Sequence, residues 1–218
     1  MPAINALESE KVKALLLSIE AAENATKLAD AVKALAVEAI PETAPNLIRA
    51  LNYNNPGAAV AAVDGLIAIG EPAVAPLLAL LDDYNYGARA WALRALSGIG
   101  DPRSLDLLLD TAANDFALSV RRAAARGLGS IHWELMATAD VAAAQGQCAE
   151  VLLGLCHDPE WVVRYSAIAG LESLGAVADR IRARLAQVAT EDETIAVQAR
   201  AQLALQRMEN LGTKKPPR

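Results

Sequence analysis

The side chains best suited to chemistry in this chain are aspartate–arginine pairs that recur at one spacing. In each pair the arginine follows the aspartate by six residues, at the start of an alanine-rich run. This pattern predicts either a polar ligand site or an internal ladder. In a ladder, the aspartate caps a helix and the arginine reaches the aspartate of a neighbouring repeat. We favour the ladder. The pairs are Asp83 with Arg89, Asp115 with Arg121, and Asp158 with Arg164.

Aromatic residues are the second candidate group. They make up only 4% of the chain, while hydrophobic residues make up 54%, most of them alanine and leucine. A core of alanine and leucine does not need aromatic rings. We therefore interpret the aromatics as an edge suited to a flat, conjugated or hydrophobic partner, the alternative being that each covers a gap between layers. Turn positions are predicted for Tyr53, Tyr84, Tyr86, Phe116 and Trp161, and first-turn helical positions for Trp91 and Tyr165.

Two further arginines, Arg94 and Arg122, fall outside the repeated pairing. Each is predicted either to hold a carboxylate of a ligand or partner, or to be a solvated surface residue. The sequence identifies no general acid or base. Asp82 and Asp83 are the acids nearest the aromatic edge and the candidates for a catalytic role, the alternative for Asp83 being its place in the ladder. The sequence has no HExxH, no GxSxG and no glycine-rich loop between a strand and a helix. It therefore predicts no metal site and no bound cofactor.

A recurring leucine shows which elements position these residues. Six runs follow the pattern small-x-x-small-Leu, with their leucines 30 to 34 residues apart except for one interval of 43 residues. This periodicity predicts an all-α fold, a right-handed α-solenoid of about five to six helical hairpins. The longer interval predicts an insertion near residues 132–147. The leucines are Leu35, Leu66, Leu96, Leu128, Leu171 and Leu205.

Charge and length exclude several classes of protein. The net charge of −6 argues against a nucleic-acid partner, which would require basic stripes. The apolar runs are too short to span a bilayer, so no membrane partner is expected. Cys148 and Cys156 fit no zinc spacing and are predicted to be buried thiols. We expect a cytoplasmic protein with one repeat domain over residues 1–211 and a flexible basic tail over 212–218.

The aspartate–arginine turns resemble those of HEAT repeats, and residues 82–129 resemble a narrower group. The blocks YNYGARAWALRAL, GDPR and DFALSVRRAAARGLG closely resemble the E/F-type phycobilin lyases, which carry short HEAT-like repeats. The resemblance extends more loosely over nearly the whole chain. The short length resembles the F-type subunit.

This resemblance implies a function. E and F subunits of that family form a heterodimer that binds phycocyanobilin and delivers it, as a substrate, to a cysteine of the phycocyanin α subunit. The product is a thioether, so the enzyme must chiefly position a flexible tetrapyrrole. The alternative is an adaptor that binds phycobiliproteins for phycobilisome disassembly or bilin removal. The residues expected to bind the bilin or partner are Tyr84, Tyr86, Arg89, Trp91, Arg94, Phe116, Arg121, Arg122, Trp161 and Tyr165.

Overall fold

The computed structural model describes residues 6–82, 86–174 and 178–213, and these residues form helices and connecting turns without a β-strand. The helices belong to two compact units, Met1–Ile99 and Gly100–Arg218. The predicted helical hairpins are confirmed in both units. The assignment of residues 1–211 to a single domain stays a prediction.

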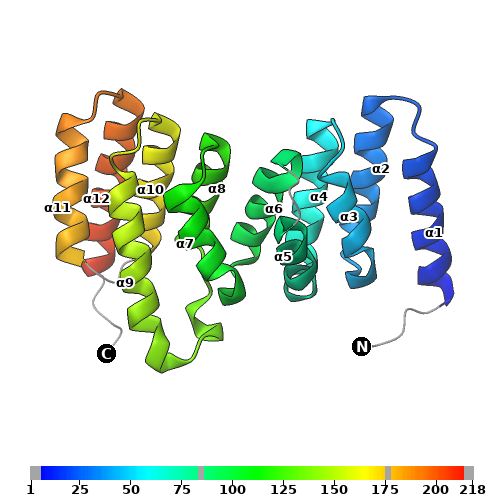
Figure 1. Cartoon of the computed structure of the whole chain (residues 1–218), viewed down its shortest axis with the longest axis horizontal. Coiled ribbons are helices and arrows are strands. Elements are labelled where there is room, and N and C mark those ends of the chain that lie inside the picture. Colours follow the sequence, from blue (N-terminus) through cyan, green and yellow to red (C-terminus); the bar gives the residue numbers. More distant parts are fainter. Residues whose placement is uncertain (1–5, 83–85, 175–177, 214–218) are drawn as a thin grey trace. The chain divides into compact units, whose positions relative to one another are not determined.

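The first unit contains three hairpins, drawn from blue to blue-green in Figure 1. Its second helices form one layer, in which α2 packs against α4 and α4 packs against α6. Two short 3-10 turns, η1 (Pro41–Thr43) and η2 (Glu71–Ala73), connect consecutive hairpins. The hairpins are α1 (Ala6–Glu20) with α2 (Ala25–Val37), α3 (Ala44–Ala50) with α4 (Pro56–Ile69), and α5 (Val74–Asp82) with α6 (Tyr86–Ile99).

The second unit has three further hairpins, drawn from green to red in Figure 1. Here α10 packs between α8 and α12. Two 3-10 turns, η3 (Pro102–Ser104) and η4 (Trp133–Leu135), precede the first and second of these hairpins. The hairpins are α7 (Leu105–Asn114) with α8 (Leu118–Leu128), α9 (Thr138–Leu155) with α10 (Trp161–Leu174), and α11 (Ala178–Glu191) with α12 (Ile195–Thr213).

The repeated sequence pattern has a direct structural cause. The motif leucines Leu66 and Leu171 are fully buried, because each fills the core between helices. The small residues of the motif allow the backbones to approach closely. A Cβ atom on Gly170 would lie 2.7 Å from the carbonyl oxygen of Ala125, on the neighbouring helix α8. Glycine is therefore required at this contact.

The boundaries differ from the sequence prediction at two aromatic residues. Tyr86 and Trp161 were predicted in turns, but they are the first residues of α6 and α10. In the turn before α10, Asp158 accepts the backbone N–H of Glu160 at 2.8 Å, so this helix begins sooner than the polar sequence suggests. Residues 132–147 form η4 and the first half of α9, which at 18 residues is longer than α7 with 10.

The length and apolarity of the described helices bear on whether one of them could span a membrane. None of them is long and apolar enough to cross a bilayer singly, whereas the pair Pro56–Ile69 and Glu71–Leu81, bent by 119°, meets those two criteria jointly.

Candidate functional site

An arginine–aspartate ladder connects the turns of the second unit. Arg121, on α8, donates from Nε and Nη2 to the two carboxylate oxygens of Asp158, at 2.8 and 3.0 Å. Its Nη1 donates to the carbonyl oxygens of Asp115 and Phe116, both at 3.0 Å. Asp115 and Asp158 also accept backbone N–H groups of their own turns at 2.8 Å. The predicted ladder is thus confirmed at this step, and Arg121 is held within it.

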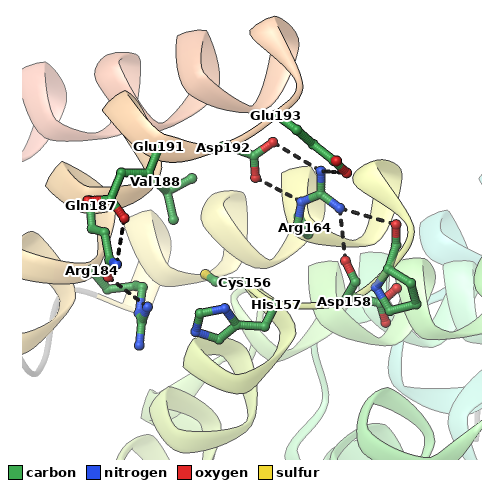
Figure 2. A pocket seen from close by; sticks show the side chains of 11 residues that line it. Cys156, His157, Asp158, Arg164, Arg184, Gln187, Val188, Glu191, Asp192 and Glu193 are labelled. Carbon is green, nitrogen blue, oxygen red and sulfur yellow. Dashed lines mark hydrogen bonds and ion pairs between the residues drawn. The ribbon is translucent and has the colours of Figure 1, made fainter.

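The next step repeats this geometry. Arg164 donates from Nε and Nη2 to Asp192, at 2.8 and 3.0 Å, and from Nη1 to the carbonyl oxygen of Asp158, at 2.9 Å. Figure 2 shows this guanidinium enclosed by its partners. The ladder extends one turn further than the sequence analysis recognised, because Gln198 donates to the carbonyl oxygen of Asp192 at 2.7 Å. Gln198 follows Asp192 by six residues, as the arginines follow their aspartates, but carries an amide in place of the guanidinium.

In the ladder, Arg164 and Asp192 stabilise each other's charged forms. Burial by itself would raise the pKa of Asp192, but hydrogen bonds from Arg164 and from the Thr194 N–H outweigh it, and the pKa is lowered. The same contact to Asp192 raises the pKa of Arg164. Both side chains are more than nine-tenths buried. A buried pair of this kind is fully charged and holds two repeats at a fixed spacing.

A cavity of about 400 Å³ lies beside this ladder, between the α9–α10 turn and α11 (Figure 2). On its α11 side, Arg184 donates to Gln187 and Gln187 donates to Glu191, each at 2.8 Å. Cys156 is buried at its base, and burial raises the pKa of this thiol to about 12. The polar groups of this cavity mostly contact one another, and the thiol is not ionised at neutral pH. The cavity therefore offers little nucleophilic chemistry.

Exposed aromatic residues mark the turn end of the second unit. Phe116 is 77% exposed, Trp161 46% and Tyr165 40%. The guanidinium carbon of Arg200 lies 5.9 Å from the centroid of the Tyr165 ring, within cation–π range. Arg122 is exposed on α8. The four predicted site residues Phe116, Arg122, Trp161 and Tyr165 therefore all lie on the surface of the second unit. Arg200 was not among the predicted site residues.

In the first unit, one predicted pair is brought together. The guanidinium carbon of Arg94 lies 4.9 Å from the centroid of the Trp91 ring, one turn away on α6. Arg89 is half-buried on the same helix and engaged in an interaction. Asp83 and Tyr84 lie outside the described residues, as do the side chains of Asp82 and Tyr86. Of the residues predicted at the aromatic edge of the first unit, Trp91 and Arg94 are therefore the pair whose arrangement the structure describes. They place an aromatic face beside a cation.

No group of three or more histidine, cysteine, aspartate or glutamate side chains with a metal-binding arrangement occurs in the described part of the chain. The Cys148 thiol is buried like that of Cys156, and burial raises its pKa to about 12 as well. Both buried thiols agree with the sequence prediction.

Comparison with known proteins places these features in a family. The chain matches the HEAT repeats family over residues 45–129 and a HEAT repeat over residues 149–178. It is 53% identical to the phycocyanin alpha phycocyanobilin lyase CpcF of Synechocystis sp., over 82% of this chain and 83% of that protein. It is 45% identical to the phycocyanobilin lyase subunit beta of Nostoc sp., over 87% and 96% of the two chains.

A solved structure gives the same result. The chain is similar to one in the complex of CpcE and CpcF of phycocyanin lyase from Nostoc sp., with 47% identity and a TM-score of 0.70, over 75% of this chain and 98% of that one. The all-α fold of HEAT-like hairpins is therefore shared with that chain. On these grounds the chain belongs to the phycocyanobilin lyase family, among its F-type subunits.

Proposed function

We propose that this chain is one subunit of a heterodimeric phycocyanobilin lyase and acts with an E-type partner. The observation that carries the proposal is its 47% identity to a chain of the CpcE–CpcF complex, of which it covers 98%. The names of the relatives support the same activity, attachment of the bilin to the phycocyanin α subunit. Phycocyanobilin is then a substrate of the protein, which requires no cofactor of its own.

The chemistry asks for positioning more than for a reactive group on this chain. The acceptor cysteine adds across a double bond at ring A of the bilin: a C–S bond forms, the π bond breaks, and the thiol proton passes to the neighbouring carbon. Nothing leaves and nothing is oxidised. Because Cys148 and Cys156 are buried thiols with pKa values of about 12, the acceptor protein supplies the nucleophile. This chain contributes by holding the tetrapyrrole in one orientation.

Trp91 and Arg94 are the best-supported contacts for this task. An indole face suits the conjugated rings, and a guanidinium suits a propionate carboxylate. On the second unit Arg122, Trp161, Tyr165 and Phe116 are exposed at the surface, where the bilin or a protein partner would meet them. Arg121 is already occupied by Asp158, which favours a structural role for it. Asp82 and Asp83 remain the candidates for an acidic residue that takes part in the reaction.

The test is a co-expression of this chain with an E-type subunit, bilin-producing enzymes and the phycocyanin α subunit. We expect a fluorescent, covalently labelled acceptor that is lost when either subunit is omitted. Labelling that persists without this chain would contradict the proposal. Binding to chromophorylated phycocyanin without any transfer would instead favour the disassembly adaptor.

A further inference from the structure

A second cavity, outside the predicted edge, lies on the first unit. It is a groove of about 510 Å³ between α2 and α4, close to the volume typical of small-molecule sites. Its walls are mostly apolar. Val37 is 73% exposed and Val60 40% exposed, and Ala61 and Ala68 line the α4 side. These two valines present apolar surface that a bound ligand would remove from water.

Small residues create this groove. A Cβ atom on Gly65 would lie 2.6 Å from the Cβ atom of Ala36 on α2, so the two helices touch and their short side chains leave the surface hollow. By the leucine register, Val60 and Asp64 of α4 occupy the positions that carry Arg122 and Arg126 in α8. Long side chains at those positions occupy space in α8, whereas α4 leaves it open.

Two opposite charges lie in the groove without partners. Lys33 and Asp64 both line it, and each stands two residues before the motif leucine of its helix. Neither side chain has a hydrogen bond or ion pair within the described part of the chain. Asp192 in the other unit, by contrast, is fully engaged by Arg164. A cation and an anion held apart on apolar walls are available to a ligand that carries both kinds of complementary group.

We propose that this groove contacts the linear tetrapyrrole in addition to Trp91 and Arg94 on the adjacent helix α6, an inference that rests on the proposed lyase function. A bilin presents broad apolar ring faces, pyrrole N–H donors and two propionate carboxylates. The Lys33 ammonium binds a propionate, and the Asp64 carboxylate accepts pyrrole N–H groups. The rings cover Val37, Val60 and the alanines. Charge complementarity of both signs and a small-molecule volume favour this ligand over a protein helix.

The decisive experiment blocks the groove without touching the core. Ala68→Trp places an indole at an exposed groove position, and Ala34→Trp places one at an exposed position of α2 outside the groove. Phycocyanobilin is titrated by absorbance into the full chain, alone and with its E-type partner. We expect Ala68→Trp to weaken binding by about tenfold or more, and Ala34→Trp by less than about twofold, with melting temperatures close to wild type.

A second arm tests the charges with substitutions that fold readily. Lys33→Met and Asp64→Asn should each weaken binding by about threefold to tenfold. The dimethyl ester of the bilin lacks the carboxylates, so it should bind the wild-type chain more weakly and be unaffected by Lys33→Met. An ester that remains sensitive to Lys33→Met would contradict the assigned contact.

Three outcomes would contradict bilin binding by the groove. The wild-type pair shows no saturable binding, or Ala68→Trp leaves binding unchanged. In the third outcome, Ala68→Trp loses the E-type partner while bilin binding persists. The last would make the groove a protein interface. Failure of the lyase function looks different. A wild-type pair that binds bilin through the groove but transfers none to phycocyanin α would contradict the function alone.

Discussion

The α2–α4 groove of the first unit and the α9–α11 cavity of the second are similar in size but opposite in character. The groove encloses about 510 Å³ between apolar walls and carries Lys33 and Asp64, neither of which has a hydrogen bond or ion pair to another described residue. The cavity encloses about 400 Å³, and Arg164 and Asp192 at its rim are bound to each other. Charges that satisfy each other hold repeats in place. Charges left unpaired on an apolar surface are available for recognition.

The largest effect is expected from removing one contact of the ladder, that of Arg164 with Asp192. Arg164→Ala leaves the Asp192 carboxylate buried without its cation, and we expect a loss of about 3 kcal/mol in the free energy of unfolding. Chemical denaturation at pH 7 measures it. Arg180→Ala, which removes an exposed ion pair with Glu150, is the matched control and should leave stability unchanged. Equal stabilities of the two variants would remove the distinction between the regions.

Acid pH should weaken the ladder next. The pKa of Asp192 in the folded chain lies below its ordinary value of 3.8. Its stabilising contribution is therefore complete above that ordinary value and is lost as the pH falls through the lower, folded-state value. We expect the wild-type chain to lose stability below about pH 4 more steeply than Arg164→Ala does. Parallel denaturation curves at pH 7 and pH 3 provide the measurement, and identical acid slopes would contradict this role of Asp192.

Trp91 offers a smaller test of the functional side. Because this half-buried indole contacts Arg94 on its own helix, Trp91→Ala should cost no more than about 1 kcal/mol of stability. We expect bilin transfer to fall severalfold more than that loss of folded protein accounts for. Initial rates of phycocyanin α labelling, normalised to folded protein, make the comparison. Proportional losses of folding and transfer would identify Trp91 as a packing residue.

The smallest expected effect concerns the cysteines. With pKa values of about 12, the buried Cys148 and Cys156 thiols should resist iodoacetamide at pH 8 until the chain is unfolded. Cys156→Ala, beside the α9–α11 cavity, should leave bilin transfer unchanged. Mass spectrometry of native and denatured samples follows the alkylation. Rapid native labelling of Cys156 would show that this cavity is more reactive than its geometry indicates.

Much of the scaffold was predictable because it obeys local rules. Leu66 and Leu171 recur with small residues at fixed offsets, and that spacing specifies both the helices and their buried faces. The ladder was predictable for Arg121 because an aspartate six residues earlier marks the turn. Gln198 was overlooked because an amide replaces the guanidinium at the same position. Its contact to the Asp192 carbonyl is visible only once the turn is folded.

The sequence by itself determined the repeat, its register and the family resemblance, and of the aromatic residues it singled out, Phe116, Trp161 and Tyr165 are exposed. The sequence also predicted the ladder pairing of Arg121, and only the tertiary structure showed which charged residues outside the ladder have partners. Lys33 and Asp64 hold the same register position in consecutive repeats, 31 residues apart, but the register does not say whether their side chains pair with each other. The contact of Gly65 with Ala36 brings their helices together and opens the groove. Whether two charged side chains meet, and whether a groove opens between two helices, depends on distances between helices. A sequence pattern does not contain these distances.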